Sequence, residues 1–212
     1  MKTVIIDYES GNLHSAEKAF RRMADEVNAG EVTVTSDPDI VRGADRIVLP
    51  GDGAFPACRK ELFDHRGLFE ATAEAVRDGG KPFLGICIGM QMLATRGMEY
   101  TETPGFDWIA GTVEAITPDD PTLKVPHMGW NDLVIDNPHP IFDGIETGQH
   151  AYFVHSYHFR VDNPAERLAH VGYGGDITAV VGRDNIVGTQ FHPEKSQATG
   201  LKMIANFLRW TP

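Results

Sequence analysis

Cys87 is the residue whose surroundings most clearly suggest chemistry. It follows the apolar run 82–86 and stands between Gly85 and Gly89, in the order Gly-x-Cys-x-Gly. A strand that turns sharply into a helix between two glycines exposes the side chain at the bend, an arrangement called a nucleophile elbow. A free cysteine is often only a small buried side chain, so the motif alone favours packing. With suitable partners, it predicts a covalent thiol nucleophile.

A second segment, residues 188–196, supplies such partners. His192 and Glu194 follow an apolar run that ends at Phe191. His192 could accept the thiol proton, and Glu194 could hold the imidazole in one tautomer. Taken alone, the pair could equally be a surface turn with an incidental ion pair. A metal site is less favoured, because no Cys-x-x-Cys or His-Glu-x-x-His spacing accompanies it. Together with Cys87, the two residues predict a Cys-His-Glu triad.

Composition limits the class of protein. The 212 residues are 42% hydrophobic and 23% charged, which predicts one globular domain over residues 1–212. Two cysteines do not suggest a disulfide framework, and we expect a reducing, cytoplasmic compartment with Cys58 as a packing residue. The net charge of −11 argues against nucleic-acid binding. No apolar run is long enough to predict a signal peptide or a membrane span.

The hydrophobic pattern predicts an α/β fold. In the first half, short apolar runs alternate with helical patterns, which indicates an open, largely parallel sheet with helices on both faces. The expected strands there are 4–7, 32–35, 46–49 and 82–86, with helices at 13–23 and 68–78. After about residue 110, short runs separated by turn residues predict antiparallel strands. These are 112–116, 133–135, 151–154 and 179–181, followed by a helix at 198–210.

The positions of the candidate residues agree with this fold. Cys87 follows the strand 82–86, and His192 follows the apolar run 187–191. Functional groups in open α/β sheets gather beyond the carboxyl ends of the strands. We therefore expect both residues at one edge of the sheet if their two strands are parallel neighbours.

Acyl chemistry at Cys87 would also need an oxyanion hole. The elbow offers the backbone N–H of Ile88. The turn Pro50-Gly51-Asp52-Gly53 could offer a second N–H, although such a turn more commonly only ends a strand. The turn at Ser10-Gly11 lacks a Gly-x-Gly-x-x-Gly pattern, so no dinucleotide cofactor is expected.

The segments Gly85–Gln91 and Gln190–Lys195 together resemble the class I, triad-type glutamine amidotransferases. The resemblance implies their flavodoxin-like fold and a reaction in which Cys87 attacks the side-chain amide of glutamine. It implies that His192 is base and acid, that Glu194 orients His192, and that no cofactor or metal is needed. It implies an oxyanion hole formed by Asp52 and Ile88. Around the bound glutamine it places Gly53, Gln91, His155, Ser156 and Tyr157.

A narrower resemblance covers nearly the whole chain. The segments 8–13, 49–55, 125–131 and 152–157 are similar to those of the glutaminase subunits of imidazole glycerol phosphate synthases. The resemblance implies a heterodimer with a (β/α)₈-barrel cyclase subunit, which receives the ammonia in histidine biosynthesis. It assigns four residues to the partner face: Asn12, Trp130, Asn131 and Lys195. By residue type alone, Trp130 would be a core aromatic and Lys195 a solvated charge.

Departures from the family pattern are few. Asp52 stands where valine is frequent, Ile88 replaces a frequent leucine, and Glu9 or Ser10 stands where glycine is more usual. Two other functions stay open: a non-catalytic regulatory subunit on the same fold, and a different amidotransferase of this class.

Overall fold

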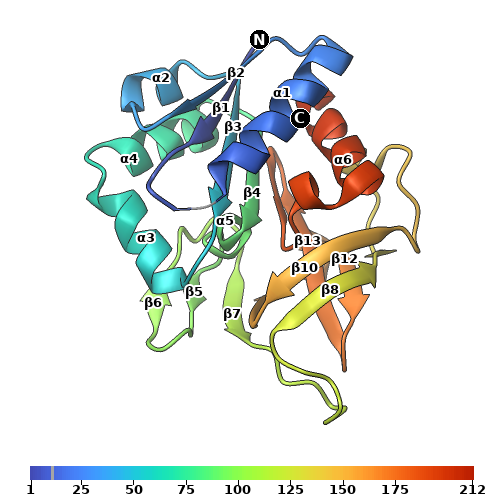
Figure 1. The fold of residues 1–212 in the computed structure, drawn as a ribbon. Helices are drawn as coiled ribbons and strands as arrows, with labels where there is room; N and C mark the ends of the chain where they lie inside the picture. The colour runs from blue at the N-terminus through green and yellow to red at the C-terminus, as the bar shows by residue number, and fades with distance from the viewer. Residues whose placement is uncertain (11) are drawn as a thin grey trace.

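An eight-stranded sheet forms the centre of the computed structural model, which describes residues 1–10 and 12–212 (Figure 1). Gly11, in the predicted turn at Ser10-Gly11, lies outside the described residues. Five neighbouring strands are parallel, and three antiparallel strands continue the sheet. The parallel strands, in sheet order, are β2 (Glu31–Thr35), β1 (Lys2–Ile6), β3 (Arg46–Gly51), β4 (Phe83–Cys87) and β14 (Ile186–Thr189). The antiparallel strands are β13 (Asp176–Arg183), β12 (Arg167–Gly172) and β9 (Val134–Ile135).

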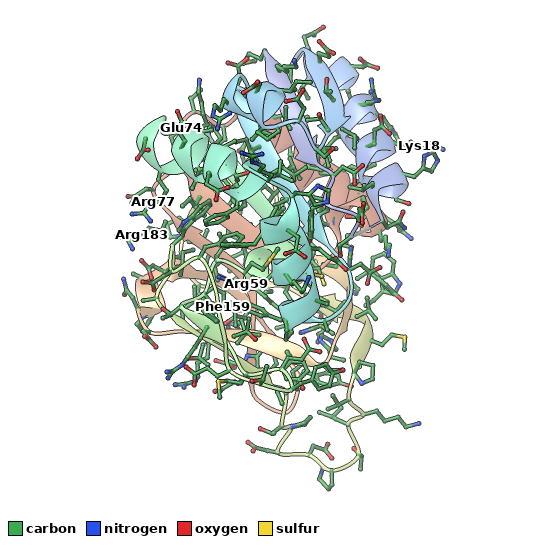
Figure 2. All side chains as sticks on the ribbon, turned by 90° about the vertical axis from the view of Figure 1, so that its left-hand side faces the viewer. Lys18, Arg59, Glu74, Arg77, Phe159 and Arg183 are labelled. Atoms are coloured by element: carbon green, nitrogen blue, oxygen red, sulfur yellow. The ribbon has the colours of Figure 1, made fainter. Side chains whose placement is uncertain are left out.

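Helices cover both faces of the parallel half. On one face, α1 (Leu13–Val27) packs against α6 (Gln197–Arg209), as Figure 1 shows. On the other lie α2 (Pro38–Arg42), α3 (Phe55–Asp64) and α4 (Leu68–Ala73), which continues into the π-helical turn η1 (Glu74–Asp78). The predicted open α/β sheet is therefore confirmed. Figure 2 shows Lys18 and Glu74 extending outward from opposite sides of the molecule.

The parallel strands read as continuous apolar runs because both of their faces are covered. Val4, Ile5 and Ile6 of β1 have no exposed surface. α1 instead buries one stripe, which includes Ala16, Phe20 and Met23 at helical spacing. The helix extends beyond the predicted residue 23 and ends at Val27, and the left-handed φ of 54° at the capping residue Asn28 suits a helix C-terminus.

Helix α3 was not among the predicted elements. It begins at Phe55 with Pro56 in its first turn, and it buries Phe55, Cys58 and Leu62 at helical spacing. The proline and this spacing were the signals available in the sequence. The expected packing role of Cys58 is consistent with its exposure of only 1%.

Two smaller sheets make up much of the second half. One holds β11 (Tyr157–Val161), β7 (Gly111–Ala115), β5 (Arg96–Gly97) and β6 (Thr103–Pro104), and the other pairs β10 (His150–His155) with β8 (His127–Asp132). The antiparallel pairs predicted for this half are confirmed, whereas β5 and β7 run parallel. The remaining short helices are α5 (Ile88–Gln91), η2 (Pro140–Phe142), η3 (Pro164–Glu166) and η4 (Pro193–Lys195). Among the described residues, no helix is long and apolar enough to cross a membrane.

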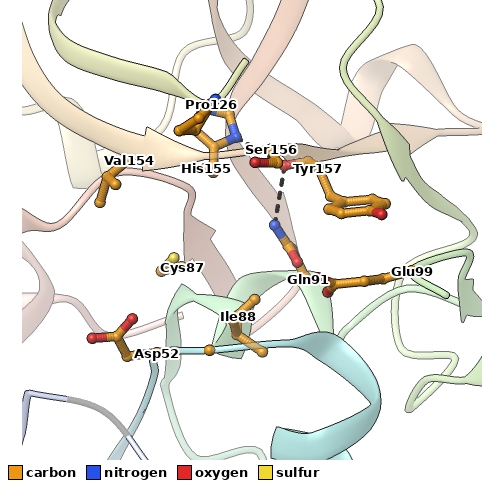
Figure 3. A pocket seen from close by; sticks show the side chains of 11 residues that line it. Asp52, Cys87, Ile88, Gln91, Glu99, Pro126, Val154, His155, Ser156 and Tyr157 are labelled. Carbon is orange, nitrogen blue, oxygen red and sulfur yellow. Dashed lines mark hydrogen bonds between the residues drawn. The ribbon is translucent and has the colours of Figure 1, made fainter.

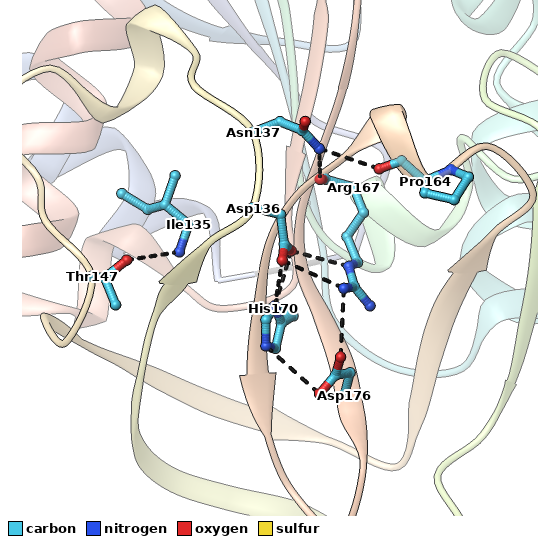
Figure 4. Close-up of polar contacts among 8 residues, drawn as sticks. All are labelled: Ile135, Asp136, Asn137, Thr147, Pro164, Arg167, His170 and Asp176. Carbon is cyan, nitrogen blue, oxygen red and sulfur yellow. Dashed lines mark hydrogen bonds and ion pairs between the residues drawn. The ribbon is translucent and has the colours of Figure 1, made fainter.

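A charged network joins the outer strands of the main sheet (Figure 4). Asp136 accepts hydrogen bonds from Arg167 Nε at 3.0 Å and from His170 Nδ1 at 2.8 Å. Asp176 lies 3.5 Å from Arg167 Nη2 and 3.6 Å from His170 Nε2. The network ties β12 to the segment after β9 and to the start of β13.

The sheet order brings the two chemical segments together. β4 and β14 are parallel neighbours, with Gly188 opposite Gly85 and Thr189 opposite Ile86. Their carboxyl ends therefore share one edge, as predicted. β3 is the other neighbour of β4 and places Gly51 opposite Cys87. This register sets the Pro50-Gly51-Asp52-Gly53 turn, called the 50–53 turn below, beside the cysteine.

Candidate active site

Cys87 lies on a sharp bend between β4 and α5. Its backbone has φ 56° and ψ −111°, a conformation that an L residue adopts only when its surroundings impose it. A β-carbon on Gly85 would overlap the backbone of Gly89, and one on Gly89 would overlap the carbonyl of Leu49. Both glycines are therefore required by close backbone approach. The predicted elbow is present, but Cys87 is buried at 6% exposure, and its side chain lines a cavity instead of standing exposed at the bend.

His192 and Glu194 form a buried pair at the end of β14. His192 Nδ1 lies 2.9 Å from Glu194 Oε1, and the two side chains are 5% and 3% exposed. A carboxylate only accepts hydrogen bonds, so Nδ1 is the donor and Nε2 is left for another partner. Ser196 donates to the His192 carbonyl at 2.7 Å and accepts from the backbone N–H of Tyr152 at 3.0 Å, which anchors this segment to β10.

The imidazole of His192 is tuned toward its charged form. Burial lowers its pKa, but the side chains of Cys87 and Glu194 act in the opposite direction and raise the pKa to about 10. The ring is therefore cationic at neutral pH, beside the thiol. A cationic imidazole stabilises a neighbouring thiolate, and that is the reactive form of a cysteine.

Gln190 is a contact of Cys87 that residue types and spacing did not single out. Its Nε2 donates to Cys87 Sγ across 3.7 Å, and its Oε1 accepts from Gln91 Nε2 at 3.0 Å. Gln91 Nε2 also lies 3.2 Å from the Tyr157 carbonyl. The available signal was a polar residue at the end of a buried strand, directly before the segment that carries His192.

A cavity of about 240 Å³ opens beside Cys87 (Figure 3). Every residue expected around an oxyanion or a bound glutamine lines it: Asp52, Gly53, Ile88, Gln91, His155, Ser156 and Tyr157. Gln91 Oε1 is buried on this wall and has no hydrogen-bond partner among the described residues. The volume suits a ligand of amino-acid size better than a larger one.

Glu99 is a further cavity residue that the sequence analysis did not name. It is 8% exposed, and its Oε2 accepts a hydrogen bond of 2.7 Å from the backbone N–H of Phe55. Figure 3 shows it beside Gln91, away from Cys87. Its carboxylate offers the cavity a negative charge suited to an ammonium group.

Two neutral histidines support the wall around Tyr157. His155 Nδ1 lies 2.8 Å from the Tyr157 carbonyl, and His155 Nε2 lies 3.0 Å from His127 Nδ1. Burial lowers the pKa of His155 to about 3 and that of His127 to about 4. Asn131 Nδ2 contacts His127 Nε2 at 3.2 Å and donates to the Gly172 carbonyl at 3.1 Å. Asn131, expected at a partner face, is thus linked to the cavity wall.

The other expected interface residues lie outside the cavity. Trp130 is 47% exposed on β8, so the reading of this residue as a core aromatic is wrong. Asn12 is exposed and caps α1 by accepting from the Ser15 N–H at 3.3 Å. Lys195 is half-buried in η4. Among residues 1–10 and 12–212, no three His, Cys, Asp or Glu side chains are grouped to hold a metal ion.

Comparison with known proteins defines the class. A model of the family "Glutamine amidotransferase class-I" matches residues 4–210. The fold is shared with a crystal structure of a glutamine amidotransferase, at a TM-score of 0.70, 21% identity and coverage of 93% and 94% of the two chains. A glutamine amidotransferase of Thermotoga maritima gives a TM-score of 0.60 at 17% identity, covering 92% of this chain and 76% of that one. The chain belongs to the class I glutamine amidotransferases, as its two motifs predicted.

Curated relatives define a narrower group. The chain is 72% identical to the imidazole glycerol phosphate synthase subunit HisH of Ruegeria pomeroyi and 70% identical to that of Cereibacter sphaeroides. Each alignment spans 212 residues and all of both chains. Within its class, the chain therefore belongs with the HisH subunits of imidazole glycerol phosphate synthase. This confirms the predicted recognition.

Proposed function

We propose that this chain hydrolyses L-glutamine through Cys87, His192 and Glu194 and passes the ammonia to a cyclase partner. The observation that carries the proposal is the buried His192–Glu194 pair, 2.9 Å apart, beside a cysteine on a strained elbow that faces a cavity. The reaction uses one water and needs no cofactor. The proposal treats residues 1–212 as one domain acting in the cytoplasm.

In the first half-reaction, the Cys87 thiolate attacks the side-chain amide carbon of glutamine. The developing oxyanion is stabilised by backbone N–H groups of Ile88 and of the Asp52 peptide. His192 gives its proton to the leaving nitrogen, and ammonia departs from a glutamyl thioester. Glu194 holds the imidazole in the tautomer that keeps Nε2 toward the sulfur and offsets its charge.

In the second half-reaction, water attacks the thioester carbonyl. His192, now neutral, accepts a proton from this water, and the tetrahedral intermediate then expels Cys87 as a thiolate, which restores the thiolate–imidazolium pair. Glutamate leaves, and the enzyme returns to its starting state. The products are one glutamate and one ammonia for each glutamine and water consumed.

Recognition of glutamine uses the far end of the cavity. The Glu99 carboxylate is suited to pair with the substrate α-ammonium group. Gln91 Oε1, without a partner among the described residues, is positioned to accept a hydrogen bond from the substrate. Gly53, His155, Ser156 and Tyr157 complete the walls. A ligand without the α-amino group would lose the charged contact with Glu99.

The partner is a (β/α)₈-barrel cyclase that uses the ammonia to make imidazole glycerol phosphate. Support comes from the names of the relatives, which are subunits of a synthase. It also comes from large exposed apolar side chains on and just before β8: Val125 at 46%, Met128 at 62% and Trp130 at 47%. The same strand carries His127 and Asn131, which connect to the cavity wall. Asn12 and Lys195 are assigned to this heterodimer interface with Trp130 and Asn131.

The test is glutamate release by the chain alone and with the co-expressed cyclase subunit and its nucleotide substrate. We expect release to rise strongly in the complex, and Cys87→Ala to abolish it in both states. The Cys87→Ala complex should still make imidazole glycerol phosphate from added ammonium salt. Equal glutamate release with and without the partner would contradict the coupling. Release that survives Cys87→Ala would contradict the nucleophile, and no release by the unsubstituted complex would favour a regulatory role for the chain.

A further inference from the structure

The 50–53 turn is held by its backbone carbonyls. The Tyr8 hydroxyl donates to the Pro50 carbonyl at 2.8 Å. The Ser10 hydroxyl donates to the Asp52 carbonyl at 2.8 Å, and Cys58 Sγ lies 3.5 Å from the same oxygen. Tyr8, Ser10 and Cys58 are at most 7% exposed, so water does not compete freely for these contacts.

The directions of these hydrogen bonds are set by donor number. Ser10 Oγ has one proton, which it gives to Asp52, so it accepts in its 3.1 Å contact with Cys58 Sγ. Cys58 must then be a protonated thiol. Burial raises its pKa, which keeps the proton on the sulfur at neutral pH. The thiol has one proton, so it supports the Ser10 hydroxyl oxygen and the Asp52 carbonyl together only by sharing that proton in a three-centre hydrogen bond.

Packing alone does not hold the outer side of this turn. A cavity of about 410 Å³ lies there, lined by residues that include Ser10, Asp52, Gly53 and Cys58. Asp52 and Gly53 are exposed. On the inner side, a β-carbon on Gly51 would crowd Ile88 and the Tyr8 hydroxyl, both at 2.8 Å. The turn is thus tightly packed toward Cys87 and depends on hydrogen bonds on its outer side.

Fixing two carbonyls limits which peptide can rotate. Side chains tether the carbonyls of Pro50 and Asp52, which fixes the peptides on both sides of the Gly51–Asp52 peptide. Its N–H is the proposed second oxyanion donor. The N–H of a trans peptide points opposite to its carbonyl, so the tether on Asp52 also turns the Gly53 N–H away from Ser10 and Cys58.

We propose that Ser10 and Cys58 are positioning residues that fix the Asp52 carbonyl and so preorganise the 50–53 turn for oxyanion stabilisation at Cys87. This inference rests on the proposed glutaminase function. Figure 3 shows Asp52, Cys87 and Ile88 around the same end of the cavity. Neither Ser10 nor Cys58 lines that cavity, so they act through the turn and do not touch substrate.

The experiment compares Ser10→Ala, Ser10→Thr and Cys58→Ala in the complex with the cyclase subunit. Ser36→Ala is the matched control, because Ser36 is an exposed serine in the same half of the chain. We expect Ser10→Ala to lower kcat for glutamine about 3- to 10-fold, as for the loss of one hydrogen bond, with KM changed less than about 2-fold. Ser10→Thr keeps the hydroxyl and should retain most of the activity. Cys58→Ala should lower kcat less than Ser10→Ala.

A second measurement distinguishes an effect on the 50–53 turn from an effect on the catalytic triad. Alkylation of Cys87 by iodoacetamide, followed by peptide mass spectrometry, needs the thiolate but no oxyanion hole. The rate of this alkylation should be the same in Ser10→Ala and the unsubstituted protein.

Three outcomes would overturn the inference: an unchanged kcat, a change confined to KM, or a Ser10→Thr protein no more active than Ser10→Ala. If Ser10→Ala does not fold, kcat and the alkylation rate of Cys87 are measured in Cys58→Ala, and these two values test the inference. Failure of the proposed function is distinct: the unsubstituted complex would then release no glutamate, or Cys87→Ala would still release it.

Discussion

His127 and His155 share one hydrogen bond of 3.0 Å in which His127 donates to His155. The direction follows from the Tyr157 carbonyl, which only accepts, so His155 Nδ1 carries a proton and the neutral ring leaves Nε2 as an acceptor. His127 Nδ1 is then the donor, and its Nε2 accepts from Asn131. The wall of the cavity therefore requires both rings to be neutral.

Acid should destabilise the fold through these two histidines. Their folded pKa values of about 4 and about 3 lie below the ordinary value of 6.5. Between the folded pKa values and 6.5, the unfolded chain binds more protons than the folded chain. The stability that comes from keeping these histidines neutral is therefore complete above pH 6.5 and is lost as the pH falls. Each histidine contributes up to about 1.4 kcal/mol per pH unit to the free energy of unfolding. We expect urea unfolding to show a smaller acid loss for His127→Gln, while the same change at the exposed His14 leaves the loss intact.

Glu194→Gln should move the alkaline limit of activity. The raised pKa of His192 keeps the ring protonated until the pH rises through about 10, and the stability gained from that charge is present below pH 6.5 and lost over the same rise. Removing the carboxylate removes one cause of the raised pKa. The alkaline limb of kcat/KM should shift toward neutral pH, and kcat should fall about 10²- to 10⁴-fold. An unchanged limb in a pH–rate profile would contradict the pairing of these residues during turnover.

Glu99→Gln should affect binding more than chemistry. The variant keeps an oxygen for the Phe55 N–H but loses the charge proposed to pair with the substrate ammonium. KM for glutamine should rise about 10- to 100-fold with a smaller change in kcat. The matched measurement uses 4-carbamoylbutanoate, which lacks the α-amino group. Both proteins should hydrolyse this amide alike, and a large difference between them would point to a different role for Glu99.

Asp52→Asn should raise glutamine turnover. The Asp52 carboxylate lines the cavity beside the place where negative charge develops, and like charges repel. Because the residue is exposed, solvent and salt weaken this effect, and we expect kcat to rise about 2- to 5-fold. The gain should shrink when kcat is measured at high salt. A lower kcat at both salt concentrations would show that the side chain supports the turn.

Asp136→Asn should weaken the antiparallel edge of the main sheet. Its carboxylate accepts from Arg167 and His170, and its side chain is 19% exposed. The variant should lose about 1 kcal/mol in the free energy of unfolding. This loss is smaller than that for a fully buried ion pair, because solvent partly screens the charges. Asp64→Asn is the control, because its pair with Lys60 is exposed. A change of the same size at both positions would contradict the network.

Some site residues could be predicted because their information is local. The glycines around Cys87 indicate a close backbone approach that leaves no room for a larger residue. His192 and Glu194 are two positions apart in one turn. Glu99 and Gln190 could not be recognised by type. Glu99 reaches the cavity because its carboxylate binds the backbone of Phe55, 44 positions away, and Gln190 faces Cys87 only through the pairing of β14 with β4.

The roles of Ser10 and Cys58 at the 50–53 turn could not be recognised from their residue types either. Their types suggested a loop serine and a packing thiol, and both contact the Asp52 carbonyl from distant positions in the chain.

The amino-acid sequence by itself determined the elbow at Cys87, the alternation of strands and helices, and the class of protein. Local sterics and the periodicity of apolar residues carry the first two, and the resemblance of two short motifs to a known family carries the third. Only the tertiary structure decided which groups meet Cys87. The order of β3, β4 and β14 sets the 50–53 turn and His192 on either side of it. Such contacts depend on strand register and buried hydrogen bonds between distant segments, which no short stretch of sequence specifies.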